Sequence, residues 1–412
     1  MAAGTLATQG TREMIWPFAI FGVIAAIAGW AHLRSEARGL SWKQLIGAAI
    51  AIHVIAALSL PFTASDLWSN TAYGRLSILG INPYAHGPDA LPVGDWARAM
   101  VHPMWASLPM PYGPVVALLQ APAGAAPDAV TGMIIWKLEI LAIAITAVIV
   151  SARFVRERFD DDEAKTRFVW FAWCPLFAWE LAGQAHNDAP LVLALLGFVW
   201  AATSGREALA LWCLALGIAA KFVAAPVAGL YLVMIARTRP LRGVLMGAAL
   251  GAFTVVTMLP FWHGVSTLSG LWTNIGPVFG HSTRSLGDLV HLCAEPFGPR
   301  ADYLAFRAFS VLGMIVSAAI ALVGIVRART PATVIQYGLL FLLAGDLFTQ
   351  VWFQPWYITW LLALALGHPD RRWLRLIAVY AALTLVTYIV PIDPLDNVLI
   401  DLFIGWQVLE LL

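Results

Sequence analysis

Charged residues are scarce in this sequence, and their scarcity excludes several classes of function. Only 12% of the 412 residues are Asp, Glu, Lys or Arg, and the formal net charge is +1. No run of Lys or Arg forms a basic face, so binding to nucleic acid through bulk electrostatics is excluded. The sequence also contains no glycine-rich phosphate loop of the nucleotide-binding kind, so no nucleotide-binding fold is expected.

Cysteine is nearly absent as well, with only Cys174, Cys213 and Cys293 in the chain. They form no CxxC pair, so neither a disulfide framework nor a thiolate metal site is expected. What is abundant instead is apolar sequence, since 60% of the residues are hydrophobic. A soluble domain of this length does not have that composition. The sequence therefore predicts an all-α polytopic membrane protein that forms a single membrane domain over residues 1–412.

Apolar segments that approach the length needed to cross a bilayer, about 20 residues, recur along the chain. They predict a bundle of about 13 transmembrane helices. Some segments are short, and the pair on either side of Lys221 offers only about 14 or 15 residues each, or about 21 to 22 Å of helix. The thirteen segments lie near residues 14–33, 44–62, 128–152, 168–184, 189–203, 207–220, 222–236, 243–262, 303–326, 332–350, 355–367, 375–391 and 396–412.

The loops between these segments differ in charge, which predicts the topology. Short cytoplasmic loops tend to carry Lys and Arg, and alternate loops of this chain hold 17 of its 25 basic residues. The pattern puts the amino terminus outside and the carboxyl terminus inside, and it requires the short pair around Lys221 to cross twice. Two large loops, 63–127 and 263–302, then lie on the extracytoplasmic face.

The first large loop begins with an unusual charge, because Asp66 directly follows an apolar segment. A carboxylate at the edge of a membrane span is costly unless it is used. The loop is also rich in aromatic residues, and the apolar spacing around Trp96, Met100 and Met104 predicts interfacial helices, broken or kinked at Pro103. An ordinary aromatic belt would explain the rings, but it would not explain Asp66.

Two further polar islands interrupt apolar sequence. The first, ELAGQAHND, places His186, Asn187 and Asp188 at the outer end of a span, where they form either a capped turn or the wall of a site. The second, QVWFQPWYITW, contains Trp356 and Tyr357. Its rings suit either interfacial anchoring or contact with a sugar or an isoprenoid chain.

Few basic residues are expected on the outer face, so those that occur are candidates for binding a phosphate. Arg284, within HSTRSLGD, has the forked guanidinium that holds phosphate oxygens bidentately; an ordinary loop arginine is the alternative. Lys221 lies near the outer end of the short pair, where a snorkelling side chain is the alternative. Arg75, in the first large loop, is a third candidate.

Taken in order along the chain, these motifs are similar to those of a known protein family. Asp66 after a span, GINPYAHGP at 80–88, YGP at 112–114, GQAHND at 183–188 and QPWYITW at 354–360 resemble the GT-C membrane glycosyltransferases. They are most similar to the bacterial polyprenol-phosphate-mannose-dependent mannosyltransferases that build lipomannan and related glycolipids. The resemblance runs over roughly residues 60–365.

The resemblance implies a GT-C-like bundle and a reaction. A polyprenyl-phosphate donor would pass its sugar, mannose in these relatives, to a lipid-linked or glycan acceptor with inversion. The acidic residue that acts as general base in the family corresponds to Asp66. We expect the donor phosphate to be neutralised by Arg284, Lys221 and Arg75. Residues expected to bind the sugar or the acceptor are Tyr84, Asn82, His186, Asn187, Asp188, Trp356 and Tyr357.

No cofactor is expected, because the lipid phosphate is itself the leaving group. A divalent metal is the alternative, since Asp66, Asp188 and His186 have suitable ligand atoms. The family points to the bacterial cytoplasmic membrane, with the active site facing the periplasm. A flippase or transporter for a lipid-linked saccharide is the rival from another class, although the polar islands gather at one face and no inverted repeat is evident. A glycan ligase or polymerase is a further alternative.

Overall fold

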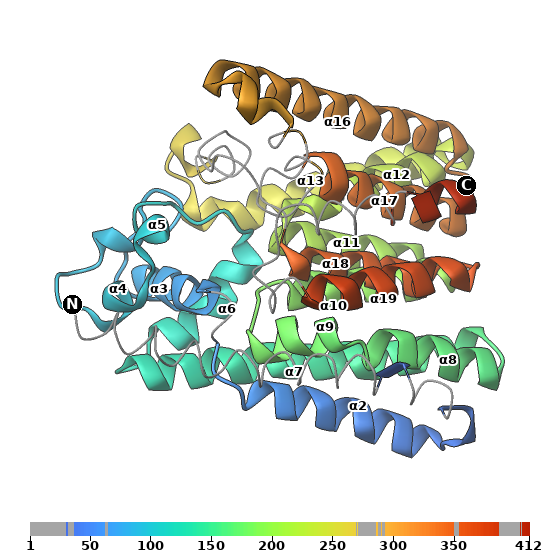
Figure 1. Cartoon of the computed structure of the whole chain (residues 1–412), viewed down its shortest axis with the longest axis horizontal. Helices are drawn as coiled ribbons and strands as arrows, with labels where there is room; N and C mark the ends of the chain where they lie inside the picture. Colours follow the sequence, from blue (N-terminus) through green and yellow to red (C-terminus); the bar gives the residue numbers. More distant parts are fainter. Residues whose placement is uncertain are drawn as a thin grey trace.

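A computed structural model gives the structure of the chain (Figure 1). It describes residues 30–31, 37–61, 65–268, 293–349, 354–386 and 406–412, together with the single positions 270, 286, 290 and 404. All regular elements among these residues are helical. The predicted span near 14–33 lies outside the described residues except at its end, as does much of the span near 396–412. Arg284 lies outside them altogether.

The α-helices are α2 (Trp42–Ala57), α3 (Asp66–Ile78), α4 (Trp96–Met100), α5 (Pro103–Ala106), α6 (Pro114–Gly124), α7 (Ala129–Arg158), α8 (Asp161–Ala172), α9 (Pro175–Phe177), α10 (Ala189–Thr203), α11 (Glu207–Ala220), α12 (Ala225–Thr238), α13 (Pro240–Met258), α16 (Pro299–Arg327), α17 (Pro331–Ala344), α18 (Ile358–Leu366) and α19 (Arg371–Val386). Single turns of 3-10 helix are η1 (Ala37–Gly39), η2 (Pro88–Ala90), η4 (Phe222–Ala224), η5 (Leu259–Phe261), η6 (Val265–Leu268), η8 (Glu295–Phe297) and η10 (Pro355–Tyr357). Two segments, η3 (Ala178–Gly183) and η9 (Gly345–Thr349), are π-helical.

The helices confirm an all-helical membrane protein, but not the predicted number of spans. Within the described residues, four helices are long and apolar enough to cross a membrane: Ala129–Arg158, Pro240–Phe261, Pro299–Arg327 and Pro331–Phe348. Several other apolar helices have 10–17 residues. They are short because proline residues and polar turns divide the apolar sequence before a full bilayer thickness has been covered.

The segment near 168–184, which was predicted as one span, illustrates this, because it is not one continuous α-helix. Helix α8 ends at Ala172, and Pro175 opens the separate short helix α9. Proline has no backbone N–H to donate and disfavours helical geometry in the residue before it, which explains the break. The chain then continues as the π-helix η3, a rare form that is frequent at functional sites.

The two short helices around Lys221 form a hairpin, as the predicted double crossing requires. Helix α11 ends at Ala220, and η4 and α12 follow directly after Lys221. Glu207, the first residue of α11, forms ion pairs with Arg239 and Arg242, which follow α12. The start of α11 and the end of α12 therefore lie at the same end of the bundle. Lys221 occupies the point where the chain reverses.

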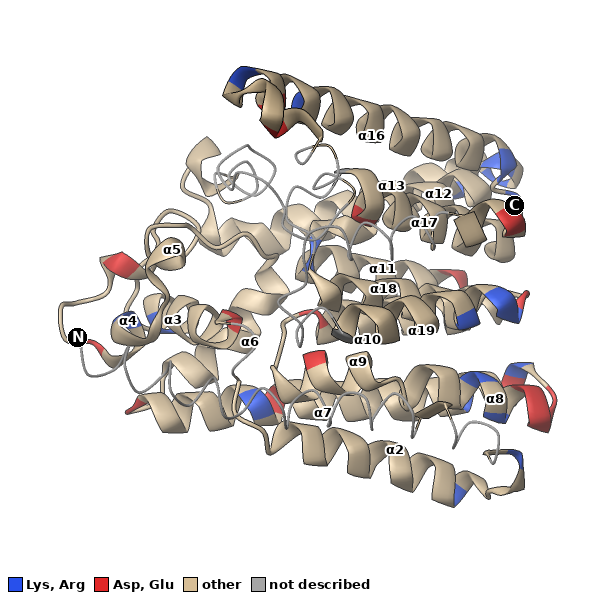
Figure 2. Ribbon diagram, viewed as in Figure 1, with Lys and Arg blue, Asp and Glu red and all other residues tan. Residues whose placement is uncertain are grey.

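The basic loops predicted to share one side do meet at one end of the bundle, as Figure 2 shows along its right edge. Bonds link loops that are far apart in sequence: Lys165 donates to the Arg38 carbonyl, Arg371 pairs with Glu163, and Arg237 donates to the Ile325 and Val326 carbonyls. We call this the basic end. It comprises residues 37–43, 153–167, 200–207, 237–242, 325–330 and 366–375.

The opposite end is formed by α3–α6 and the turns after α13 (Figure 1). We call it the loop end, residues 65–128 and 259–268. Helices α3 and α6 pack almost backbone to backbone here, which is possible because Gly74 has no Cβ. A Cβ at this position would lie 1.9 Å from the Gln120 carbonyl oxygen. The helical region around Trp96 is broken before Pro103, as predicted, into α4 and α5.

Candidate active site

Asp66 is the first residue of α3, at the junction between the loop end and the bundle. Its side chain is 22% exposed, in contrast to the wholly buried acidic residues nearby. One turn further along α3, the Asn70 side chain donates a hydrogen bond from Nδ2 to the Asp66 carbonyl oxygen at 2.8 Å. The backbone of Asp66 is therefore fixed while its carboxylate stays accessible.

Asn70 also joins α3 to two other elements. Its Oδ1 accepts hydrogen bonds from Gln120 Nε2 of α6 at 2.7 Å and from Asn187 Nδ2 at 2.8 Å. All three amide side chains are buried. Buried amides that bond to one another hold a single geometry, because a broken bond would leave a polar group unsatisfied. The position of Asp66 is thus coupled to the turn that contains Asn187.

That turn, residues 184–188 between η3 and α10, is fixed by hydrogen bonds from two side chains of α7. Trp136 Nε1 donates to the Ala185 carbonyl oxygen at 2.8 Å, and Lys137 Nζ donates to the carbonyl oxygens of Ser59 and Gly183. Ala185 has φ of 57°, a left-handed conformation that costs a residue with a Cβ about 1–2 kcal/mol. Such strain persists only where the surroundings impose it, and it is concentrated at functional sites.

His186, the next residue, lies between two carboxylates. Its Nδ1 is 3.6 Å from Asp66 Oδ2, and its Nε2 is 3.1 Å from Glu180 Oε2. Trp356 stacks on the imidazole with ring centroids 3.7 Å apart and an interplanar angle of 19°. The ring can therefore neither tilt nor rotate without losing one of these contacts.

The charge state of His186 follows from the same contacts. Burial by itself lowers the pKa of the imidazole, but contact with Asp66 and Glu180 outweighs it and raises the pKa from 6.5 to about 9. Because the folded pKa lies above the ordinary value, the imidazolium stabilises the fold fully below about pH 6.5. That contribution is lost as the pH rises through about 9.

Asp188 does not cap α10, which was the alternative for this turn. Although it occupies the N-cap position, its side chain makes no capping bond. Both carboxylate oxygens instead accept hydrogen bonds from Lys221 Nζ at 2.8 Å, and Oδ1 accepts another from Trp360 Nε1. The carboxylate is completely buried, and these hydrogen bonds satisfy both of its oxygens there.

Lys221 lies among aromatic rings as well as against Asp188. Its Nζ is 5.2–5.5 Å from the ring centroids of Tyr112, Tyr357 and Trp360, within the range of cation–π attraction. An ammonium group has three N–H donors, and Asp188 accepts from it through two oxygens. Within the part of the chain that the structure describes, no other group accepts from this ammonium, so one donor is left for a ligand.

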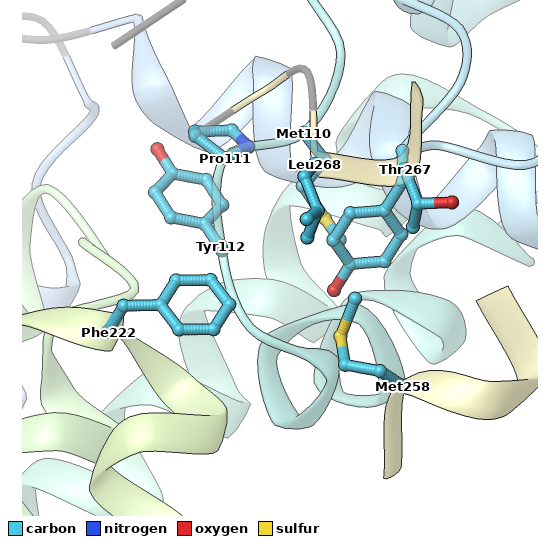
Figure 3. Close-up of a pocket in the computed structure, with 8 residues that line it drawn as sticks. Met110, Pro111, Tyr112, Phe222, Met258, Thr267 and Leu268 are labelled. Carbon is cyan, nitrogen blue, oxygen red and sulfur yellow. The ribbon is translucent and has the colours of Figure 1, made fainter. Parts of the chain in front are cut away.

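A small apolar pocket adjoins Lys221 (Figure 3). The Tyr112 and Phe222 rings form one side of it, and Met258 and Thr267 lie across from them. Tyr112 is shared with the ring cluster around Lys221, and Phe222 is its neighbour in sequence. Gly113 allows this close packing, since a Cβ there would lie 2.2 Å from the Ala219 carbonyl oxygen. The pocket therefore begins where the cation is held.

The structure gathers most of the residues singled out in the sequence. It leaves Arg75 and Asn82 apart, and Tyr84 lines the adjoining pocket. Those brought together at the junction are Asp66, His186, Asn187, Asp188, Lys221, Trp356 and Tyr357.

Arg75, Asn82 and Tyr84 lie in the loop end and have other contacts. Arg75 follows Asp66 by nine residues on α3, about 13 Å at the helical rise, and pairs with Asp95 at 3.0 Å. Asn82 donates to the Phe261 carbonyl and accepts from the Tyr84 backbone N–H. The Tyr84 ring packs against Phe261 and lines the pocket. The contacts of Arg75 and Asn82 hold the loop end together.

Several buried residues of the site were not predicted to have a role: Glu180, Asn70, Gln120 and Trp360. Two of them carry a signal that the sequence offers. Asn70 follows Asp66 by four residues and Trp360 follows Trp356 by four, the spacing of one helix face. Glu180 belongs to the same polar island as His186, but the π-helix that turns it inward cannot be read from the sequence.

No group of three or more His, Cys, Asp or Glu side chains among the described residues is arranged to hold a metal ion. Asp66 and Glu180 approach opposite nitrogens of His186, so the three do not converge on one point. The densest acidic run, residues 160–163, lies at the basic end. There, Asp160 caps α8 and Glu163 pairs with Arg167 and Arg371.

The fold and this junction define a helical membrane protein with a polar, aromatic-walled site between its loop end and its bundle. Comparison with known proteins gives the family. The profile of the MptA_B family, described as Alpha-(1->6)-mannopyranosyltransferase, N-terminal domain, matches residues 2–238, more than half of the chain. The protein belongs to this family and is a mannosyl-transferring glycosyltransferase. No curated protein matches the chain.

Proposed function

We propose that the protein transfers mannose from a polyprenyl-phosphate donor to a hydroxyl of a lipid-linked or glycan acceptor, with inversion at the anomeric carbon. Asp66 is the general base. The observation that carries this role is the contrast between Asp66, whose carboxylate is partly exposed at the junction, and the buried Glu180 and Asp188, whose carboxylates face His186 and Lys221. A base must reach the proton that it removes.

The donor phosphate binds beside Lys221. The remaining ammonium donor would stabilise the charge that develops on the departing phosphate, as a fixed cation does in a site sheltered from water. The pocket lined by Tyr112, Phe222 and Met258 is apolar and begins next to the cation, but it has room only for a water-sized group, so the isoprenoid chain lies outside it. Arg284 remains a second candidate for the phosphate.

The sugar and the acceptor lie between Asp66 and the aromatic residues. Trp356 and Tyr357 offer ring faces there, and His186, Asn187 and Asp188 form the polar wall. The family description supports an α-(1→6) linkage in the product. Inversion then requires a donor with the β configuration.

The reaction takes place on the extracytoplasmic side of the bacterial inner membrane. Two observations support this side: the loops rich in Lys and Arg share the basic end, and Asp66 lies toward the opposite end. Basic loops face the cytoplasm in most membrane proteins.

A product assay tests the proposal. Purified protein in detergent is incubated with a mannosylated acceptor lipid and either mannosyl polyprenyl phosphate or GDP-mannose. We expect a mass increase of one hexose with the lipid donor alone, and release of the added mannose by an α-(1→6)-specific mannosidase. Transfer from GDP-mannose but not from the lipid donor would contradict the donor class. A product that resists the mannosidase would contradict the linkage.

The same assay separates the alternatives. A ligase or polymerase would add a preassembled glycan, so the mass would rise by several hexoses in one step. A flippase would give no product, while moving the lipid-linked sugar across the bilayer of a reconstituted vesicle. Either result would contradict the proposal.

A further inference from the structure

Glu180 stands out among the acidic residues at the site because it is wholly buried and its close ionic partner is His186. Its side chain is 0% exposed, and Oε2 lies 3.1 Å from His186 Nε2. An uncompensated buried carboxylate costs several kcal/mol. A residue needed only to fill space at this position would be apolar. The charge therefore indicates a function of the Glu180–His186 pair.

The backbone holds Glu180 and His186 next to each other. Glu180 lies in the π-helix η3, and its carbonyl oxygen accepts a hydrogen bond from the His186 N–H at 3.2 Å. The strained Ala185 between them is fixed by Trp136 of α7. The imidazole is thus presented with one nitrogen toward Glu180 and the other toward Asp66.

Other charged and titratable groups around the turn are engaged elsewhere. Lys137 of α7 donates to the Ser59 and Gly183 carbonyl oxygens, and Asp188 is paired with Lys221. The Tyr112 hydroxyl interacts with the Asn187 side chain, and its ring lies next to the Lys221 ammonium. Tyr357 stacks on Trp360. Asp346 of η9 lies close enough to Tyr357 to affect it electrostatically. Within the described residues, Asp66 and Glu180 are the two acids in contact with His186.

We propose that Glu180 is a positioning residue for mannosyl transfer: it holds His186 as an imidazolium whose Nδ1–H faces Asp66 Oδ2, so that the other oxygen of Asp66 is directed at the acceptor. This rests on the proposed role of Asp66 as the base. Glu180 itself touches no substrate. It acts through His186, whose imidazole ring is kept in its orientation by stacking on Trp356.

In the transfer step, Asp66 accepts the proton of the acceptor and the lipid phosphate is the leaving group. The acceptor O–H bond breaks and its proton moves to Asp66 Oδ1 as the acceptor oxygen forms a bond to the anomeric carbon. The bond between that carbon and the phosphate oxygen breaks, and the phosphate leaves with the electron pair. The His186 proton stays on the ring throughout. The imidazolium offsets the charge of two close carboxylates before transfer and of Glu180 afterwards.

The test is the pH dependence of transfer by Glu180→Gln, which keeps the shape and removes the charge. With one of its two acids lost, His186 releases its proton at lower pH. If transfer needs the imidazolium, kcat of the unsubstituted protein should fall as the pH rises through the His186 pKa of about 9. We expect Glu180→Gln to move this alkaline limb down by about one to three units. The KM for the donor should stay unchanged. Glu180→Asp, which restores the charge, should return the limb toward its original position.

Glu207→Gln is the matched control, since Glu207 lies at the basic end with Arg239 and Arg242. It should leave the limb unchanged. If Glu180→Gln lowers thermal stability or yield but keeps the original limb, Glu180 is structural and the proposal is wrong. Asp66→Asn, assayed in parallel, tests the base separately. If it is inactive while Glu180→Gln keeps the limb, the proposed function stands and this inference alone fails.

Discussion

At the basic end, charged side chains pair near the surface, often with a neighbour one helical turn away. Arg153 with Glu157 and Lys165 with Asp161 are examples. At the junction beside the loop end, each pair has at least one buried member and joins segments far apart in sequence, as Lys221 does with Asp188 and His186 with Asp66. Figure 2 shows many charged residues at the first place and few at the second.

The difference separates the charges that indicate topology from the charges of the proposed active site. An exposed pair contributes little stability because water and salt screen it. A buried pair must repay the cost of desolvating two charges, and often does not. Most charges at the basic end are therefore explained by membrane orientation. Arg167 is an exception, because its side chain is buried and donates hydrogen bonds to the carbonyl oxygens of Leu366, His368 and Pro369. The charges at the junction need another explanation, and the role in mannosyl transfer that we propose for them supplies one.

Breaking the buried pair should give the largest loss of stability. Asp188→Asn leaves the Lys221 ammonium without an anion, and we expect a cost of about 3–5 kcal/mol. Thermal unfolding in detergent measures it. The double variant Asp188→Asn with Lys221→Met removes both charges and should recover part of the loss. If the double variant is no more stable than Asp188→Asn, the stranded charge is not the cause.

Removing the amide that links α3, α6 and the 184–188 turn should have an intermediate effect. Asn70→Ala leaves Gln120 Nε2 and Asn187 Nδ2 buried without their acceptor. We expect a total cost of about 2–3 kcal/mol, since a buried polar group left unsatisfied costs about 1–3 kcal/mol. Thr71→Val is the control, because Thr71 is equally buried and, among the residues that the structure describes, its side chain bonds only within α3, to the Trp68 carbonyl. Equal destabilisation by the two variants in thermal unfolding would argue against a linking role for Asn70.

The smallest effect is expected at the basic end. Arg153→Gln removes an ion pair whose two side chains are 68% and 46% exposed. The unfolding midpoint should not shift measurably at physiological salt. A large shift would show that exposed pairs also hold this bundle together, and the contrast between the two ends would fail.

The sequence predicted some parts of this structure better than others. The membrane class and the gathering of the basic loops at one end follow from composition and charge, which do not depend on packing. The division of the segment near 168–184 follows from Pro175, whose effect on a helix is local. The number of full spans could not be predicted, because a short apolar helix that turns back at a polar site has the same composition as one that crosses.

The site was predictable in its residues more than in their partners. Asp66, His186 and Asp188 interrupt apolar sequence, and that alone marks them. Arg75 was expected at the donor phosphate, but its distance from Asp66 along α3 and its pairing with Asp95 depend on the fold. The Glu180 side chain points inward because of a π-helix, which no residue pattern predicts. Contacts between distant segments are set by packing, and a single sequence does not contain them.

The most direct test of the account is a single-turnover measurement on Asp66→Asn, with donor bound first and acceptor added second. Asp89→Asn is the control, since Asp89 is an exposed residue of the same loop. We predict that Asp66→Asn binds the donor with unchanged Kd but transfers mannose about 10²- to 10⁴-fold more slowly, while Asp89→Asn transfers normally. Transfer by Asp66→Asn at the unsubstituted rate would contradict the assignment of Asp66 as the base.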